Sequence, residues 1–443
     1  LAGTATQPGD LGTAATAAAT DFASTAQGAF ATLRAALDSG RSCAINVLSD
    51  STGAGTGNWV DLLAQSLAAA YPGHTVKRRE WVDGTQDYAA PVVVQTGPGG
   101  ESNVRLTGVR GIYAPNPGPF TDLDLRIKLS MDSYTTGTKT LMAIKSAGAF
   151  SNIYWFMPVS GIPGLKWSSD GGASQASTSY ASTGPSFAAG TVGWLRVTLD
   201  VDNGAGGHTI THYTSTDGVA WTVVGSPEVR AGVTSVSHDA SQSLEVGAQG
   251  LSGGPWPGNV YEADVRTIIG GPSIAPRSMD DYGASLSTDV VRSGAPTLEI
   301  INGSQPGAGL TYLGDATRLP RMTPNYGRGV LLTSVSHNDG PLAGAAFTTP
   351  YAALVAAALA RLPNASPIPV TQNPRIAPAV RIDEQAIRRL DTMAWARARG
   401  YGSVDAYRAF GTGVGLLGVD GVHPNSAGSA VWRDAVLAEA GLL

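Results

Sequence analysis

The chain has 443 residues, of which 42% are hydrophobic and only 14% are charged, and its formal net charge is -5. This length exceeds the usual size of one domain, so we expect two or more domains with sizeable cores. The 29 lysines and arginines are scattered instead of forming a basic stripe, which argues against nucleic acid as a partner.

Nothing in the sequence indicates a membrane protein. The longest apolar run covers residues 351–360, far short of the roughly 18 to 20 residues that span a bilayer, and no signal peptide is visible. The single cysteine, Cys43, excludes an internal disulfide and a thiolate metal cluster. Because it lies in the apolar run "CAINVLS", we expect a packed core thiol.

Residues 1–40 are predicted to form a helical segment. Apolar residues recur there at spacings of three or four, and Gly40 ends the pattern. We expect this apolar face to pack on the next domain; the alternative is that it pairs with copies of itself and forms a homo-oligomer. The residues of the face are Phe22, Ala26, Phe30, Leu33 and Leu37.

Residues 41–104 show the pattern of an α/β domain. "CAINVLS" is typical of a strand buried on both faces of a parallel sheet. The following "NWVDLLAQSLAAAYPG" is typical of a helix, with Asn58 as its N-cap and Pro72-Gly73 as its end.

Residues 105–272 are predicted to form an all-β domain. The stretches "DLDLRIKLS", "WLRVTLDVD" and "VYEADVRTI" each alternate apolar and polar residues, and clusters of Gly, Ser, Asn and Asp separate them. No helical period interrupts them, so we expect a two-sheet antiparallel sandwich.

The α/β pattern returns in residues 273–443, with buried strands in "PTLEIING" and "GVLLTSVS" and helices in "PYAALVAAALARL" and "IDEQAIRRLDTMAWARARG". The first α/β piece is too small to form a core of its own. The sequence therefore predicts one α/β domain interrupted by an inserted sandwich.

Four stretches place chemically active residues at the expected sheet edge. Ser51 follows the first buried strand in "LSDSTGAG", where open α/β folds place their sites. Gly307 and Asn338 follow two other buried strands and can offer hydrogen-bond donors. In "DGVHPN", His423 can act as a general base on a hydroxyl and Asp420 can orient its ring.

These stretches resemble the four sequence blocks of SGNH or GDSL-type hydrolases, and they occur in the same order. The blocks are "SDS" at 49–51, "NGSQPGAG" at 302–309, "SHND" at 336–339 and "DGVHPN" at 420–425. The resemblance implies a flavodoxin-like three-layer α/β fold. It also implies a serine esterase that needs no cofactor and no metal.

The resemblance assigns a role to each residue. Ser51 would be the nucleophile, His423 the base and Asp420 its orienter. The oxyanion hole would consist of the Ser51 and Gly307 N–H groups and the Asn338 side chain.

Two departures and two alternatives accompany this assignment. Ser49 and Ser336 stand where the family has glycine, and we expect these small residues to be tolerated. Gly84 is a second candidate for the glycine of the oxyanion hole. His337 is an alternative candidate for the general base, although its place in the block favours a residue that lines the pocket or caps a strand.

The inserted domain resembles the concanavalin or laminin-G type jelly roll, and "STDGVAW" resembles a hairpin of that family. Its five tryptophans suggest sugar stacking, against the plainer expectation of core packing. Trp256, flanked by Gly and Pro, is the best candidate for an exposed ring; the others are Trp155, Trp167, Trp194 and Trp221. A Ca²⁺ site at Asp200, Asp202 and Asn203 is less expected than a polar turn.

Together these features predict a serine esterase that removes an O-acyl group, most simply acetyl, from a polysaccharide or cell-wall glycan. The combination looks like tail-associated proteins of phages that infect high-GC actinobacteria, which suggests an extracellular or virion-associated location. The alternative is a glycan-binding or structural tail protein whose hydrolase fold no longer turns over substrate.

Overall fold

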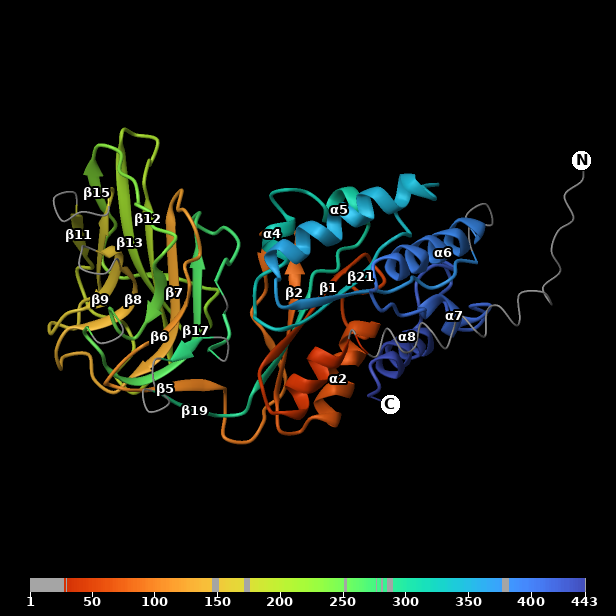
Figure 1. The fold of residues 1–443 in the computed structure, drawn as a ribbon, viewed down its shortest axis with the longest axis horizontal. Coiled ribbons are helices and arrows are strands. Elements are labelled where there is room, and N and C mark those ends of the chain that lie inside the picture. Colours follow the sequence, from red (N-terminus) through yellow and green to blue (C-terminus); the bar gives the residue numbers. More distant parts are fainter. Residues whose placement is uncertain are drawn as a thin grey trace, which may run out of the picture.

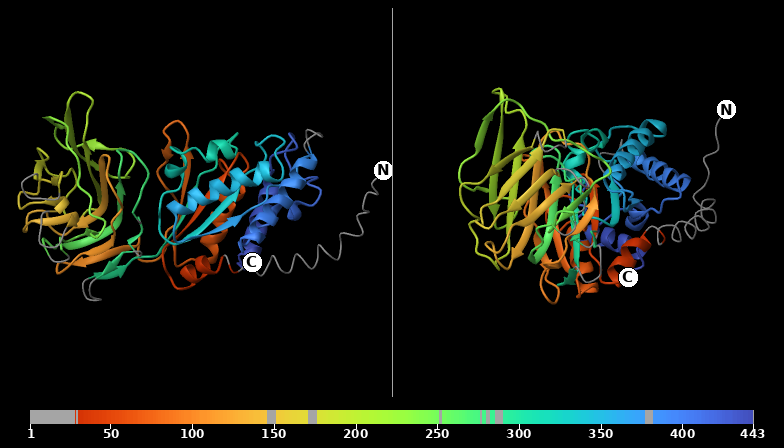
Figure 2. Two further views of the ribbon diagram at one scale, coloured as in Figure 1. Left: turned by 45° about the horizontal axis from the view of Figure 1, so that its top comes forward. Right: turned by 60° about the vertical axis from the view of Figure 1, so that its left-hand side comes forward.

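The computed structural model describes residues 28, 30–145, 151–170, 176–250, 253–275, 277–279, 282–284, 290–376 and 382–442. They form an α/β domain and a β-sandwich that lie beside each other along the long axis of the molecule (Figures 1 and 2). No helix in these ranges is long and apolar enough to cross a membrane.

The α/β domain is built on one central sheet. Its order is β22 (Ala365–Pro369), β21 (Gly329–Ser334), β1 (Cys43–Ser49), β20 (Thr297–Asn302), β2 (Thr75–Val82) and β3 (Asp87–Tyr88), with β4 (Val92–Gln95) also on β2. The strands from β22 to β2 are parallel, whereas β3 and β4 run antiparallel to β2.

A parallel bridge between Val370 and Val404 extends the sheet beyond β22. The run β20, β1, β21, β22 and Val404 therefore has the 2-1-3-4-5 order of flavodoxin-like sheets. β2 is an additional strand on the β20 side of this run, next to the sandwich.

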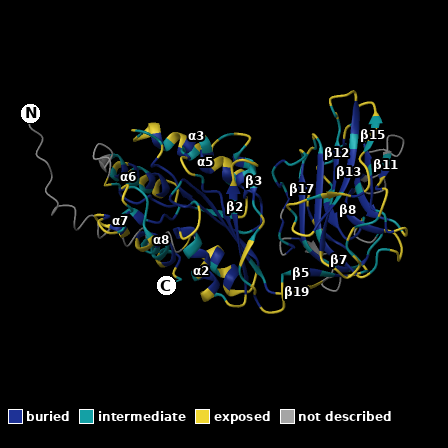
Figure 3. Cartoon of the chain, turned by 180° about the vertical axis from the view of Figure 1, so that it is seen from behind, coloured by how far each residue is buried: buried dark blue, intermediate teal, exposed yellow. Residues whose placement is uncertain are grey.

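Helices cover both faces of the sheet, because β1 presents apolar side chains to both faces. Cys43, Ile45 and Val47 pack in one core with α2 (Trp59–Ala70), α7 (Ala406–Phe410) and α8 (Ser426–Glu439). Ala44 and Leu48 point to the other core, with α3 (Leu310–Leu313), α4 (Leu319–Met322), α5 (Ala345–Arg361) and α6 (Ile382–Ala398). This confirms the predicted three-layer fold and the buried position of Cys43, and Figure 3 shows the strands as the buried layer.

The described part of the N-terminal segment is helical over residues 30–38. Phe30, Leu33 and Leu37 are buried in the same core as α2 and α8. These three of the five residues of the predicted apolar face therefore pack on the α/β domain, while Phe22 and Ala26 lie outside the described residues.

The sandwich consists of two antiparallel sheets around one apolar core. One sheet has the order β11 (Ala176–Tyr180), β10 (Gly164–Ser168), β9 (Ser151–Met157), β8 (Lys139–Lys145), β16 (Ser243–Val246), β6 (Ile112–Pro115) and β18 (Gly283–Ala284). The other has the order β14 (Thr222–Val223), β13 (Gly207–Ser215), β12 (Gly193–Asp200), β7 (Leu123–Met131), β17 (Pro257–Arg266), β5 (Asn103–Thr107) and β19 (Val290–Ser293), with β15 (Glu228–Ala231) on β13.

The sandwich extends past its predicted end at residue 272. β18 pairs with β6 and β19 pairs with β5, and Met279 and Tyr282 belong to the sandwich core. These two short strands are the edge strands of the two sheets of the sandwich. The chain therefore returns to the α/β sheet only after Ser293.

The expectation of an exposed Trp256 is wrong. Its side chain is fully buried, and its Nε1–H donates to the Thr140 carbonyl at 2.5 Å. The flanking glycine serves packing, since a Cβ on Gly258 would lie 2.6 Å from the ring. Of the five tryptophans only Trp221 is partly exposed.

The stretch considered for Ca²⁺ forms a polar turn. The side chain of Asp202 accepts the Gly204 N–H, and that of Asn203 accepts the N–H groups of Ala205 and Gly207. These carbonyl and carboxylate oxygens therefore stabilise their own loop.

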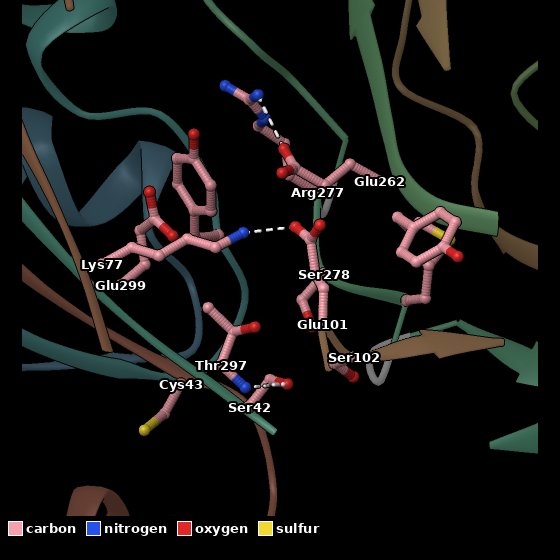
Figure 4. A pocket seen from close by; sticks show the side chains of 13 residues that line it. Ser42, Cys43, Lys77, Glu101, Ser102, Glu262, Arg277, Ser278, Thr297 and Glu299 are labelled. Atoms are coloured by element: carbon pink, nitrogen blue, oxygen red, sulfur yellow. Dashed lines mark hydrogen bonds and ion pairs between the residues drawn. The ribbon is translucent and has the colours of Figure 1, made fainter. Parts of the chain in front are cut away.

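A cluster of buried charges joins the two domains (Figure 4). Arg79 on β2 donates to Glu299 on β20 at 2.5 Å, and its guanidinium lies 3.9 Å from Glu262 of the sandwich. Arg277 donates to Glu262 at 2.8 Å. The Tyr326 ring packs against Arg277 and Arg79, whose Cζ atoms lie 4.6 Å and 5.5 Å from its centre.

Another carboxylate of this cluster, Glu101, lies beside the crossing between the domains. Lys77 on β2 and Lys128 on β7 both donate to Glu101. Next to Glu101 the outgoing and returning segments pair with each other, because the Ala295 N–H donates to the Gly100 carbonyl at 2.9 Å. The two domains are therefore fixed to each other by charge as well as by chain connections.

Glu262 is ionised although it is buried. Burial raises its pKa, but Arg277, Arg79, Lys77 and Lys128 outweigh this effect and lower the pKa to about 2. Folding is thus linked to deprotonation of Glu262. Its contribution to stability is present above the ordinary pKa of 4.5 and is lost as the pH falls through about 2.

We predict that Glu262→Gln lowers the free energy of unfolding at pH 7 by about 3 to 5 kcal/mol, because it leaves Arg79 and Arg277 buried with one partner fewer. The difference between wild type and variant should shrink as the pH falls from about 4.5 towards 2. Urea denaturation at several pH values measures both effects.

The matched control is Asp132→Asn, which breaks the exposed Asp132–Arg105 pair and should cost less than about 1 kcal/mol. Equal losses in the two variants, or a Glu262→Gln effect that does not change with pH, would contradict the role given to this cluster.

Candidate active site

Three adjacent strands bring the predicted site residues to one edge of the sheet. Ser51 follows β1, Gly307 lies in the loop after β20, and Asn338 follows β21. Because β20 and β21 flank β1 in parallel, their carboxyl ends meet on either side of Ser51. Asp420 and His423 come from the loop that precedes α8.

Ser51, His423 and Asp420 form a continuous chain of hydrogen bonds. The Ser51 hydroxyl lies 2.7 Å from Nε2 of His423, and Nδ1 of the same ring lies 2.5 Å from Oδ2 of Asp420. With the ring proton on Nδ1, Nε2 is free to accept the proton of the serine. The side chains of His423 and Asp420 are 45% and 48% exposed, so solvent reaches the far end of the chain.

Local hydrogen bonds fix the loop that carries the imidazole. Oδ1 of Asp420 accepts the N–H groups of Val422 and His423, and the Gly418 N–H donates to the His423 carbonyl. Partial burial raises the pKa of Asp420, but the hydrogen bonds from the His423 ring and from these N–H groups outweigh it and lower the pKa to about 2. Asp420 is therefore a carboxylate at neutral pH.

The loops on either side of Ser51 offer hydrogen-bond donors. Gly307 has φ of 75°, a backbone conformation that favours glycine, and it is exposed. Among the described residues, no group accepts a hydrogen bond from the Ser51 or Gly307 N–H. Asn338 is exposed, and its amide donates one proton to the Ala308 carbonyl at 3.0 Å, which leaves the second proton available.

The structure separates the two rival candidates from the site. Gly84 follows β2, which is separated from β1 by β20, whereas the loop of Gly307 follows the neighbour of β1. His337 is buried and its Nε2 lies 3.0 Å from the Asn373 carbonyl. Burial lowers its pKa to about 4, so the ring is neutral, and its contact is with a backbone carbonyl and not with the Ser51 hydroxyl.

Ser49 and Ser336, the two departures from the SGNH or GDSL-type sequence pattern, are accommodated by hydrogen bonds. Ser336 is buried, and its Oγ lies 3.0 Å and 2.9 Å from the side-chain carbonyls of Gln372 and Gln385. The hydroxyl of Ser49, also buried, lies 3.5 Å from that of Thr52. The extra hydroxyl groups are thus part of a polar layer beneath the site.

Gln372 is the centre of this polar layer and was not identified from the sequence. Its Nε2 donates to the buried carboxylate of Asp50 at 2.6 Å and to the Ser334 carbonyl at 3.1 Å. Its Oε1 accepts the His337 N–H at 2.6 Å. Since Asp50 also accepts the N–H and hydroxyl of Thr52, Gln372 connects the turn of Ser51 to the loop of Asn338.

Asn302 has the same role on the other side. Its amide donates to the Gly53 carbonyl at 2.7 Å and to Glu80 at 2.9 Å, and its carbonyl accepts from Ser304. One feature of the sequence could have indicated this polar layer. Asp50 and Asn302 are polar residues that stand directly at the ends of buried strands.

Comparisons with known proteins give distant likenesses only. No protein-family model matches the chain, and no curated protein has a similar sequence. A carbohydrate-binding module of family 40 from the Ruminococcus gnavus IT-sialidase, bound to α2,3-sialyllactose, is 9% identical. This match covers 38% of this chain and 91% of that one, with a TM-score of 0.29.

Two hydrolases match the other domain. A variant of an acetyl xylan esterase from Geobacillus stearothermophilus is 17% identical over 33% of this chain and 74% of that one, with a TM-score of 0.27. A GDSL-like lipase from Parabacteroides merdae is 18% identical over 33% and 74%, with a TM-score of 0.28. At these TM-scores, function has to be inferred from the site itself.

We predict that Gln372→Leu lowers the free energy of unfolding by about 2 to 4 kcal/mol. The change leaves the Asp50 carboxylate and the His337 N–H buried without one of their partners. Urea denaturation measures the loss, with Gln65→Leu on the exposed side of α2 as the control for the same substitution. Similar stabilities of the two variants would contradict this role of Gln372.

Proposed function

We propose that the protein is a serine esterase that removes an acyl group through an acyl-enzyme. The observation that carries this proposal is the hydrogen-bonded chain from Ser51 through His423 to Asp420. The resemblance of the four sequence blocks to SGNH or GDSL-type hydrolases supports it independently of the coordinates.

In the proposed acyl transfer each of these groups has a separate role. His423 takes the proton of Ser51 as the hydroxyl oxygen attacks the ester carbonyl, and Asp420 stabilises the imidazolium that forms. The Ser51 and Gly307 N–H groups and the Asn338 amide stabilise the oxyanion. The imidazolium then protonates the leaving alcohol, and His423 activates a water that hydrolyses the acyl-enzyme.

The substrate we propose is an O-acetyl ester on a polysaccharide or cell-wall glycan. Exposure of His423, Asp420, Asn338 and Gly307 supports access by a large substrate, since a polymer needs an open site. The attached sandwich, which is not needed for acyl transfer, supports a separate binding role.

We predict that the protein releases acetate from p-nitrophenyl acetate and that a serine-directed phosphonate labels Ser51. Ser51→Ala should abolish both, measured by release of p-nitrophenol and by peptide mass spectrometry. Failure of the wild type in both experiments would leave a binding protein with a hydrolase fold as the better description.

We predict that Asn338→Ala lowers kcat by about 10² to 10³, because one oxyanion donor is lost. KM should change little, since this donor acts mainly on the charge of the transition state. Asn364→Ala is the control for amide removal, because Asn364 is exposed and directly precedes β22, at the opposite edge of the parallel sheet. An unchanged kcat in a folded Asn338→Ala variant would remove Asn338 from the oxyanion hole.

We predict that Asp420→Asn lowers kcat by about 10³ to 10⁴, because an amide in this place no longer stabilises the imidazolium. Since the pKa of Asp420 is about 2, loss of activity between pH 7 and pH 4 should not come from protonation of Asp420. A pH–rate profile with two acidic protonation steps in this interval would contradict this assignment.

A further inference from the structure

A cavity of about 310 Å³ lies between the two domains, outside the group of residues that surround Ser51. Its walls come from β7, β12 and β17 of the sandwich and from β2, β3 and the segment after α4 of the α/β domain. The volume is within the range of about 300 to 1,000 Å³ that is typical of small-molecule sites. Six arginines line it, namely Arg79, Arg126, Arg196, Arg266, Arg277 and Arg321.

On the sandwich side two arginines share a single carboxylate. Arg126 donates to Asp124 at 3.0 Å and 2.8 Å, and Arg196 donates to it at 2.8 Å and 2.9 Å. Both use Nε and Nη2, so neither Nη1 has a partner among the described residues. Asp264 also interacts with Arg126, but it is shared with Arg266. The three arginines Arg126, Arg196 and Arg266 therefore outnumber the two aspartates Asp124 and Asp264, and this wall of the cavity carries an excess positive charge.

An aromatic ring lies beside these guanidinium groups. The Cζ atoms of Arg126 and Arg196 are each 5.5 Å from the centre of the partly exposed Trp221 ring. Trp194 holds this ring in place edge to face, with the ring centres 6.3 Å apart. Trp221 belongs to the hairpin that turns at Gly218, where φ is 76°.

The other charges around the cavity are compensated within the protein, with one exception. Arg266 pairs with Asp264 at 2.9 Å, and Arg79 and Arg277 pair with Glu299 and Glu262. Asp87 lies 3.7 Å from Arg266. On the α/β side Arg321 is half-buried and makes a single long contact, 3.5 Å, with the Gln86 carbonyl.

We propose that this cavity binds a carboxylate-bearing sugar, with its carboxylate on Arg126 and Arg196 and its ring against Trp221. Two unused Nη1 groups suit a carboxylate, because guanidinium groups bind its two oxygens in a planar arrangement. A neutral sugar would leave the excess charge uncompensated, and a free inorganic anion would not use the aromatic surface. Arg321 faces the ligand from the second domain.

The test is isothermal titration calorimetry of the full chain with unacylated ligands, so that the result does not depend on esterase activity. The probes are methyl glucuronide and methyl galacturonide, each compared with its neutral methyl glucoside or galactoside, and sodium acetate. We expect at least one uronide to bind 10-fold or more tightly than its neutral partner and than acetate. Its affinity should fall as salt is raised.

Variants locate the binding. Trp221→Ala and Arg321→Gln should each weaken uronide binding by 5-fold or more, and neither removes a partner of Asp124. Arg196→Gln should weaken it further. Arg105→Gln, at an exposed ion pair elsewhere on the sandwich, is the control and should bind as the wild type does.

The proposal would be overturned by no binding of either uronide, by equal binding of uronides and neutral sugars, or by unchanged binding in Trp221→Ala and Arg321→Gln. Acetate that binds as tightly as the uronides would show a general anion site and would also overturn it. Because none of the probes carries an ester, failure here would leave the proposed esterase activity untouched.

Discussion

The parallel pairing of β20, β1 and β21 is the constraint on which the rest of the structure depends. In its register β20 ends opposite Val47 and β21 ends opposite Ser49, so all three strands end at the same edge of the sheet. The strands come from both sides of the inserted sandwich, and only their pairing brings the loops of Ser51, Gly307 and Asn338 together. The insertion leaves and returns at the opposite, amino-terminal edge, where Gly100 and Ala295 pair. The crossing itself therefore does not occupy the carboxyl ends of β20, β1 and β21.

The buried charges between the domains have a cost as well as a benefit. Removing Arg79, Arg277, Glu262 and Glu299 from water is unfavourable, and mutual attraction repays this only when every group is paired. Such an interface is poorly suited to sliding or to a second orientation, because a displaced charge would remain buried without a partner. An apolar interface of the same area would tolerate a shift more easily. We infer that the cluster contributes to the fixed orientation of the two domains more than to their net stability.

The chemistry of the site was easier to predict from the sequence than its support. Ser51, Asp420 and His423 stand in short stretches of a known pattern, and strand ends in a parallel sheet necessarily meet at one edge. Gln372 acts through hydrogen bonds to groups that are remote in the chain, so no local pattern marks it, and Asn302 was marked only by its position at the end of a buried strand. Trp256 was misjudged because Gly and Pro around a tryptophan indicate a loop, whereas here Gly258 makes room for the ring. The end of the sandwich was missed because β18 and β19 are too short to show alternation.

The fixed domain orientation connects the two proposed sites. The cavity lies on the β2 side of the sheet, and Ser51 lies at the end of β1, with β20 between these strands. A glycan chain held in the cavity by an acidic sugar would present its neighbouring residues at a high effective concentration near the serine. This gain requires that the domains do not move apart, because it falls as the linkage between two sites becomes longer and more flexible. The ion cluster at Glu262 would then affect turnover of a polymer while leaving hydrolysis of a small ester unchanged.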